Sequence, residues 1–137
     1  MTLGPTDYTD IVLDHYRAPR NVGDLPDATG VGTAGNPEDG DFLRLAIRVE
    51  KGRLAEVRFQ TFGCPAAIAA GSVATELLAG RTLDQVLSFG NHDVVTALGG
   101  LPKPKLKCSV LAEQALRVAL RDHYERSGES VPGELAE

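Results

Sequence analysis

The segment between residues 43 and 62 most constrains the fold, because its pattern predicts two strands joined by a tight turn. In the first half, apolar residues alternate with polar ones as in a strand that buries one face, at Leu43, Leu45, Ile47 and Val49. Lys51-Gly52 supplies the turn, where glycine accepts positive φ. The return strand, residues 53–62, directs Val57 and Phe59 inward. The pattern therefore predicts a β-hairpin with one face on a core.

A helix built from small residues is expected directly after the hairpin. Gly63 breaks the strand, Cys64 begins the next element, and Pro65 suits a first helical position. Residues 66–79 are rich in alanine, and small side chains allow a helix to pack closely on a sheet. Gly80 is the expected C-terminal cap.

Helical spacing also marks both ends of the chain. Near the N-terminus, apolar residues recur at helical intervals over residues 8–16, and Pro19 ends the run. The last helix is expected over residues 110–124, where it would bury Leu111, Ala115 and Val118. Two shorter helices are predicted between them, the first opened by a capping box at residues 82–85.

Residues 17–41 contain many glycines and prolines, which indicates irregular chain with one short strand near residues 31–34. Long irregular connections in compact domains usually carry function, so we expect a functional loop here. With 137 residues, the chain has the length of a single domain. We assign residues 1–126 to it, followed by a polar C-terminal tail at residues 127–137 that is expected to fray.

The composition argues against several classes of partner. A net charge of −5 disfavours nonspecific binding to nucleic acid. Apolar runs are all too short to span a membrane, and the N-terminus does not resemble a signal peptide. Two cysteines without a secretion signal indicate a reducing, cytoplasmic location, with free thiols or metal ligands rather than a disulfide.

The two cysteines are the strongest candidates for chemistry, because each lies where a helix is expected to begin. Cys64 precedes the alanine-rich helix and Cys108 precedes the last helix. Unpaired N–H groups at a helix N-terminus favour a thiolate, which can bind metal or accept sulfur. The alternative is that both are small buried apolar residues, since free cysteine is often buried.

An acidic turn, Asp39-Gly40-Asp41, could add oxygen ligands to the two thiolates. Two carboxylates and two thiolates would make a four-coordinate site suited to zinc or ferrous iron. The alternative is a solvated turn before a strand. His15, His92 and His123 are interpreted as exposed or partly buried surface histidines rather than ligands, although a thiol enzyme that pairs a cysteine with a histidine is a further alternative.

Four segments in the same order resemble the IscU/NifU-type iron–sulfur cluster scaffold family. Residues 14–21 match the family's D-H-Y-x-x-P-R-N signature, and residues 59–69 match its second cysteine segment. Residues 35–41 resemble its loop ending in C-G-D, and residues 105–113 resemble its K-x-H-C-S-x-L-A-E segment. The match runs from about Tyr8 to Tyr124. The resemblance implies an α+β fold, with a small antiparallel three-stranded sheet packed against several helices and the ligand residues gathered at one end.

The resemblance also implies a function without catalysis. A scaffold of this family accepts sulfur from a cysteine desulfurase, binds iron, and passes a [2Fe–2S] cluster to client apoproteins. It would use Cys64, Cys108, Asp41 and Asp39 as ligands. The alternative is a zinc-binding accessory protein of the same pathway that holds no cluster, although the chain lacks the insertion typical of the zinc-containing SufU branch.

This chain departs from the family pattern at positions that bear on the site. Asp39 replaces the first cysteine, and Lys107 replaces the histidine before the third. Carboxylate is a harder ligand than thiolate, so a cluster should be held less tightly. Lys107 is expected to lower the pKa of Cys108 and to pair with Asp39 or Asp41.

A further segment resembles the family's site for a chaperone of the Hsp70 class, L-P-P-V-K, with an altered middle. It is predicted to be exposed and consists of Leu101, Pro102, Lys103, Pro104 and Lys105.

Overall fold

A computed structural model of the protein describes residues 8–36 and 40–135. Its fold is of the α+β class, as expected, with a three-stranded sheet and several helices. One helix precedes the three strands in the sequence, and the other helices follow them. The elements in chain order are α1 (Asp10–Arg17), β1 (Gly30–Asn36), β2 (Asp41–Glu50), β3 (Arg53–Phe62), α2 (Pro65–Leu78), α3 (Leu83–Val86), α4 (Asn91–Ala97), the 3-10 turn η3 (Lys103–Lys105), α5 (Leu106–Ser127) and the 3-10 turn η4 (Gly133–Leu135).

The sheet is antiparallel, with the strand order β1-β2-β3. The predicted hairpin is confirmed: Leu45 pairs with Phe59, and the turn residues Lys51 and Gly52 have φ values of 53° and 74°. A register shift between Arg48 and Val49 marks a bulge close to the turn. The short strand expected near residues 31–34 extends over all of β1 and forms the third strand.

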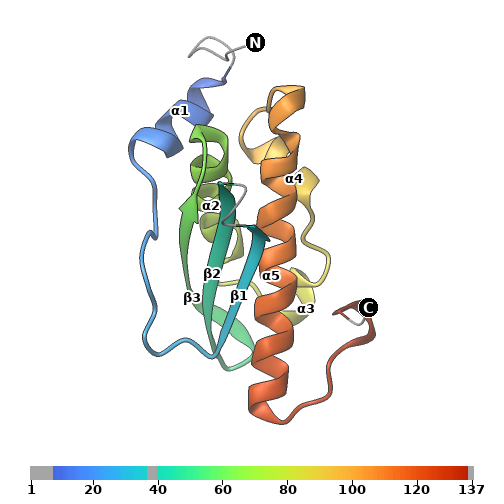
Figure 1. The fold of residues 1–137 in the computed structure, drawn as a ribbon. Helices are drawn as coiled ribbons and strands as arrows, with labels where there is room; N and C mark the ends of the chain where they lie inside the picture. The colour runs from blue at the N-terminus through green and yellow to red at the C-terminus, as the bar shows by residue number, and fades with distance from the viewer. Residues whose placement is uncertain (1–7, 37–39, 136–137) are drawn as a thin grey trace.

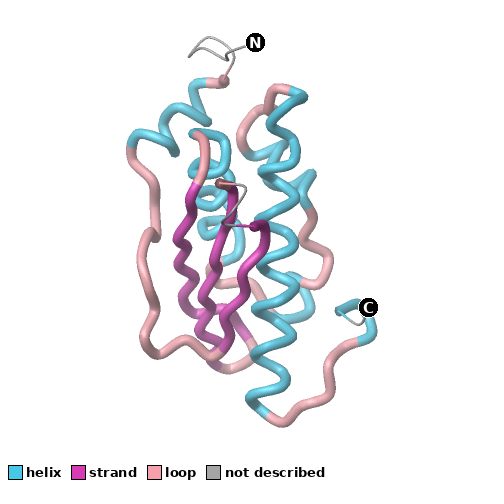
Figure 2. The backbone as a smooth tube through the Cα atoms, viewed as in Figure 1, coloured by secondary structure: helices cyan, strands magenta, loops and turns pink. Residues whose placement is uncertain are grey.

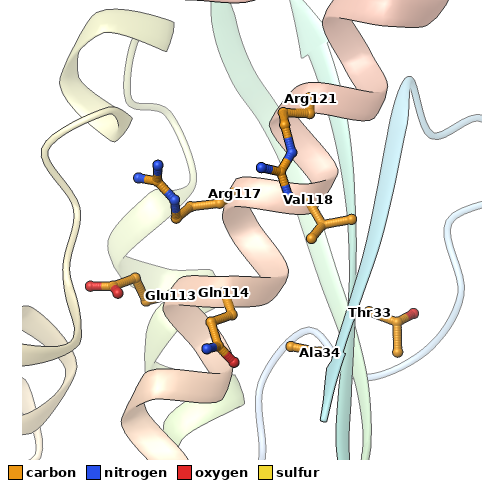
Figure 3. Close-up of a pocket in the computed structure, with 7 residues that line it drawn as sticks. All are labelled: Thr33, Ala34, Glu113, Gln114, Arg117, Val118 and Arg121. Carbon is orange, nitrogen blue, oxygen red and sulfur yellow. The ribbon is translucent and has the colours of Figure 1, made fainter. Parts of the chain in front are cut away.

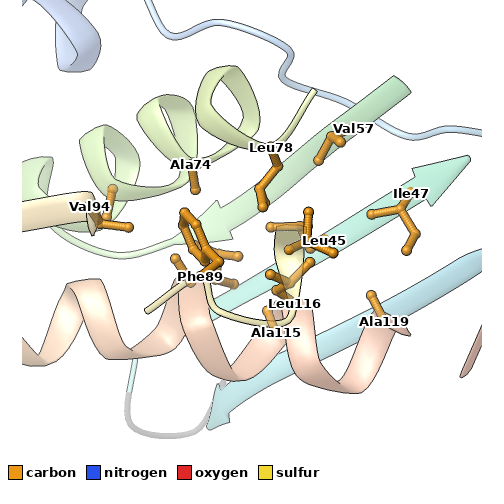
Figure 4. Packing of buried hydrophobic residues seen from close by; sticks show 14 of the residues in the cluster. Leu45, Ile47, Val57, Ala74, Leu78, Phe89, Val94, Ala115, Leu116 and Ala119 are labelled. Carbon is orange, nitrogen blue, oxygen red and sulfur yellow. The ribbon is translucent and has the colours of Figure 1, made fainter. Parts of the chain in front are cut away.

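Helices α2 and α5 cover one face of the sheet, which gives the molecule two layers (Figures 1 and 2). Figure 4 shows the core between these layers, where Leu45 and Ile47 from the sheet meet Leu78 and Leu116 from the helices. Small residues on α2 are required by this packing. A Cβ added to Gly71 would lie 2.4 Å from a ring carbon of Phe59.

Helix α5 differs from its prediction in its start and in its buried face. It begins at Leu106, so Cys108 lies in its first turn rather than before it. The residues it buries most deeply towards the sheet are Ala112, Ala115, Leu116 and Ala119, whereas Leu111 and Val118 are only half-buried. The alanines permit a close approach, because β1 passes so near to α5 that a Cβ on Gly32 would lie 2.3 Å from the Ala115 carbonyl oxygen.

Helix α1 is fastened to α2 by buried polar contacts. The Ser72 hydroxyl lies 2.7 Å from His15 Nδ1 and accepts a hydrogen bond of 2.9 Å from the Arg20 amide. His15 and His123 are both buried, so the interpretation of all three histidines as surface residues is wrong for these two. His92 is exposed, as expected.

The described part of the C-terminal segment packs back on α5 and does not fray. Leu135 is 1% exposed, and its carbonyl accepts a hydrogen bond of 3.1 Å from Arg121. The segment was expected to fray because its composition is polar, but the apolar side chain of Leu135 is buried and holds it in place. Within the described residues, the helices are all too short or too polar to cross a membrane.

Five element ends gather at one end of the molecule, the upper end in Figure 1. The carboxyl ends of β1 and β3 lie there, together with the beginnings of β2, α2 and α5. Residues that are far apart in the sequence are thereby brought together at this end.

Candidate functional site

The two cysteines meet at this gathered end. Cys64 is the N-cap residue of α2, with extended backbone (φ −77°, ψ 172°), and Cys108 is the third residue of α5. Their Sγ atoms are 3.7 Å apart, and both are free thiols. Cys108 is 1% exposed, whereas Cys64 is only partly buried. Two chemically reactive sulfurs therefore form a contact pair with one member open to solvent.

The two cysteines form a hydrogen bond in which one is the donor and the other the acceptor. The Cys108 thiol donates a hydrogen bond to Cys64, which lowers the pKa of Cys64 from 9.0 to about 5, assisted by the Ala67 amide and the Lys105 ammonium. The same hydrogen bond raises the pKa of Cys108, as do its burial and the negative charges of Cys64 and Asp41. Cys64 is the thiolate and Cys108 the thiol at neutral pH.

The expectation that Lys107 lowers the pKa of Cys108 is wrong, since the pKa of that thiol is raised. Lys105 is the cation that acts on the pair, and its own pKa is raised chiefly by the negative charge of Cys64. Lys107 is directed to the acidic side of the site, where its Nζ lies 3.9 Å from Asp41 Oδ2. The two lysines are two residues apart and serve different anions.

Asp41, the first residue of β2, lies beside the cysteine pair. A Cβ built on Gly63 would be only 2.9 Å from Asp41 Oδ1, so this carboxylate borders the residue before Cys64. Gly63 has a φ of 155°, in a region that glycine adopts most readily. Asp39 lies outside the described residues, and its position as a ligand stays a prediction.

The sulfur pair has the separation that a shared metal ion requires. Two thiolates bound to one tetrahedral ion with bonds of about 2.3 Å lie about 3.8 Å apart. The observed 3.7 Å matches this value without any movement of the side chains. Among residues 8–36 and 40–135, there is no group of three or more cysteine, histidine, aspartate or glutamate side chains placed to hold a metal ion. The donor set at this site is therefore two sulfurs, with Asp41 beside them.

Apolar groups surround the two sulfurs on the protein side. Cys108 packs with Ala66 and Ala67, and Tyr8 and Leu101 lie against this cluster. On the solvent side, Phe62 ends β3 with 69% of its surface exposed and stacks on Phe42 at 5.9 Å between ring centroids. The exposed ring of Phe62, stacked on the half-buried Phe42, therefore lies two residues from Cys64 in the chain.

The segment from Leu101 to Lys105 is exposed only in its middle, so the prediction that it is exposed is wrong at both ends, where Leu101, Pro102 and Lys105 are half-buried. Lys103 and Pro104 are exposed and belong to the turn η3, whereas Leu101 packs against the core. Leu101 anchors the segment in this way and places Lys105 beside Cys64.

A surface groove lies elsewhere, along α5 and the edge of β1 (Figure 3). It has a volume of about 450 Å³ and is lined by Thr33, Ala34, Glu113, Gln114, Arg117, Val118 and Arg121. Arg117 and Arg121 also donate hydrogen bonds to the Glu134 and Leu135 carbonyls. The groove contains neither cysteine, so it is separate from the thiol pair.

A family model described as the NifU-like N terminal domain matches residues 7–130. The chain belongs to this family. It is 50% identical over 121 residues to the iron–sulfur cluster assembly scaffold protein IscU 1 of Archaeoglobus fulgidus, a match that covers 88% of this chain and 79% of that protein. It is 45% identical over 126 residues to the scaffold protein IscU of Azotobacter vinelandii, covering 88% and 97%.

Solved structures agree on the fold of this NifU-like domain. The N-terminal part of a nitrogen-fixing NifU-like protein from Brucella abortus superimposes with a TM-score of 0.68 at 15% identity, and covers 87% of this chain and 95% of that one. The predicted family and fold class are thus confirmed.

Sequence reasoning missed two features of this site. It did not assign Lys105 to Cys64, although a lysine three residues before Cys108 could have been placed beside the same helix end. It also missed the stacked aromatic pair of Phe42 and Phe62, of which Phe62 is exposed. Their partner positions across the predicted hairpin could have revealed it, since residues paired across a sheet lie side by side.

Proposed function

We propose that this protein is a scaffold on which an iron–sulfur cluster is assembled and from which it is transferred. The observation that carries the proposal is the Cys64–Cys108 pair, whose sulfurs are 3.7 Å apart at the gathered end of the fold. Relatives that are 40–50% identical over most of this chain bear the name of iron–sulfur cluster assembly proteins. The cluster is cargo, so the protein itself is a carrier and not an enzyme.

Each proposed ligand contributes according to its chemistry. Cys64 and Cys108 supply thiolates, and the raised pKa of Cys108 means that iron must displace its proton. Asp41 supplies a carboxylate, and Lys107 at 3.9 Å offsets its charge while the site is empty of iron. Asp39 is proposed as the fourth ligand by its place in the family loop. We propose a [2Fe–2S] cluster, held more loosely than by three thiolates.

Partners follow from the two ends of this process. We propose that a cysteine desulfurase supplies the sulfur and that client apoproteins receive the cluster. The exposed ring of Phe62, stacked on Phe42, offers an apolar contact near Cys64 for either partner. The exposed part of the segment from Leu101 to Lys105 is proposed as a site for an Hsp70-type chaperone, and a peptide covering residues 99–107 that fails to bind one would remove that partner.

A cytoplasmic location, or another reducing compartment, suits the site. The thiols must remain reduced to bind iron. In an oxidising compartment, two thiols whose Sγ atoms are 3.7 Å apart would readily form a disulfide.

Reconstitution under anaerobic conditions tests the scaffold role. The parent chain, incubated with ferrous iron and inorganic sulfide, should develop the visible absorption of a cluster and then lose it to an apoferredoxin. Cys64→Ser and Cys108→Ser should each fail to hold the cluster. Ser88 is exposed and is not near either cysteine in the sequence, so Ser88→Ala should behave like the parent. Full cluster formation in both cysteine variants would refute this site. Binding of zinc without cluster formation would instead indicate the zinc-binding alternative.

A further inference from the structure

The thiol pair can do more than bind iron, because two contacting thiols together hold two electrons that a bound sulfur atom can accept. Sulfur carried on a cysteine as a persulfide is in the sulfane state, whereas a cluster contains sulfide. A reduction by two electrons must therefore separate sulfur acceptance from cluster formation. Two thiols that become one disulfide supply these two electrons, and Cys64 and Cys108 are two such thiols in contact.

The exposure of the two residues determines which sulfur would be loaded. Cys64 is partly exposed, whereas Cys108 is 1% exposed and packs against Ala66 and Ala67. An incoming sulfur donor therefore reaches Cys64 first. The Lys105 ammonium beside Cys64 also attracts an anionic donor.

The contact between the pair determines which atom Cys108 would attack. Its Sγ already lies 3.7 Å from Cys64 Sγ, so a sulfur added to Cys64 must extend away from Cys108, towards solvent. The inner sulfur of the persulfide then faces Cys108, and the outer sulfur is placed as the leaving group. Bond formation needs the two Sγ atoms to approach to about 2.0 Å. The approach falls to Cys64, which lies at the loop–helix junction directly after a glycine, rather than to Cys108 inside α5.

We infer that Cys108 resolves a persulfide on Cys64, releasing hydrosulfide and leaving a Cys64–Cys108 disulfide. The bond between Cys64 Sγ and the outer sulfur breaks, and a bond between the two Sγ atoms forms. The proton of the Cys108 thiol leaves with the outer sulfur as hydrosulfide. The two cysteine sulfurs are oxidised, and the outer sulfur is reduced by two electrons. An external dithiol then reduces the disulfide and restores both thiols.

This reaction has a consequence for the order of events. The disulfide removes both thiolate ligands at the moment when sulfide is released, so a cluster cannot form on the site until the dithiol has acted. Sulfide production and iron binding are therefore separated in time on the same two residues. The inference rests on the proposed function, since it takes Cys64 as the acceptor of sulfur.

The test uses glutathione persulfide as the sulfur donor, without iron or other reductant, and follows intact protein mass and free sulfide. The parent should release one equivalent of sulfide per chain and end two hydrogen atoms lighter, and added dithiol should restore its mass. Cys108→Ser and Cys108→Ala should instead gain one sulfur atom on Cys64 and keep it. The alanine variant serves as a second test in case the serine variant misfolds, because an alanine at position 108 would pack against Ala66 and Ala67. Cys64→Ser should take up no sulfur.

Several results would overturn the inference. A parent chain that keeps the extra sulfur on Cys64 shows that Cys108 does not resolve it, and extra sulfur on Cys108 shows attack on the outer atom. Attachment of glutathione to the Cys108 variants shows a different route to the disulfide. If the parent keeps the persulfide yet builds a cluster from iron and inorganic sulfide, only this inference fails. If no variant takes up sulfur, sulfur acceptance by Cys64 fails as well.

Discussion

The shared proton of the cysteine pair makes a quantitative prediction for the alkylation of Cys64 by iodoacetamide. Only the thiolate reacts, so the rate should rise through a midpoint near pH 5 in the parent chain and stay level up to neutral pH. Cys108 stays protonated and buried in this range and does not contribute. Removal of its S–H donor in Cys108→Ala eliminates the largest cause of the lowered pKa. The midpoint should then move upward from 5 towards the ordinary 9.0.

The midpoint must be measured, because the rate at a single pH is misleading. At pH 7, a thiol of pKa about 5 is about 99% ionised, and one of pKa 9.0 only about 1%. A thiolate of lower pKa is, however, a weaker nucleophile by about 40- to 100-fold for this difference. The two effects nearly cancel, so we expect the rate at pH 7 to differ by less than about threefold if the pKa rises all the way to 9.0.

Two lysine variants control this experiment. Lys105→Gln should raise the Cys64 midpoint, because that ammonium stabilises the thiolate, whereas Lys103→Gln should leave it in place. A parent midpoint near pH 9, or one that Cys108→Ala does not move, would refute the proton sharing described here.

Three further changes test the packing and the ligand set. Gly71→Val forces a side chain against a buried phenylalanine ring and should lower the free energy of unfolding by about 1–3 kcal/mol or more in urea, while Gly133→Val meets open space and should change it little. Ser72→Ala leaves the buried imidazole and an amide of the N-terminal segment without their partner, so it should cost about 1–3 kcal/mol in the same assay; an unchanged midpoint would contradict that role. Asp39→Cys should lengthen the lifetime of the reconstituted cluster in chelator, and a gain seen only when Lys107→His is added would show that ligand softness alone does not set the lifetime.

The hairpin and the small-residue helix could be predicted because local pattern determines them. Alternation identified the inward face at Leu45 and Ile47, and these residues are fully buried. Gly80 follows the end of α2 with a φ of 85°, as a capping glycine should.

The start of α5 could not be predicted, because no local signal marks it. Its N-cap residue, Lys105, makes no side-chain hydrogen bond to the helix, and the preceding turn η3 leads directly into it. The burial of His15 was missed for a related reason. Its partner Ser72 is 57 residues away, and a single histidine gives no sign of such a contact.

The meeting of the cysteines depended on the resemblance and not on spacing. They are 44 residues apart and share no local motif, so only the arrangement of α2 and α5 brings them together. Lys105 lies beside Cys64 and Lys107 beside Asp41 because their side chains point in different directions at the start of α5. The sequence alone could not assign these directions.

Metal and sulfide analysis of the protein purified without oxygen, combined with its visible absorption spectrum, is the decisive test of a cluster on Cys64 and Cys108. We expect iron and acid-labile sulfide in equal amounts, with cluster absorption that disappears in Cys64→Ser and in Cys108→Ser. Iron and sulfide retained in both variants, or zinc without sulfide in the parent, would contradict this expectation.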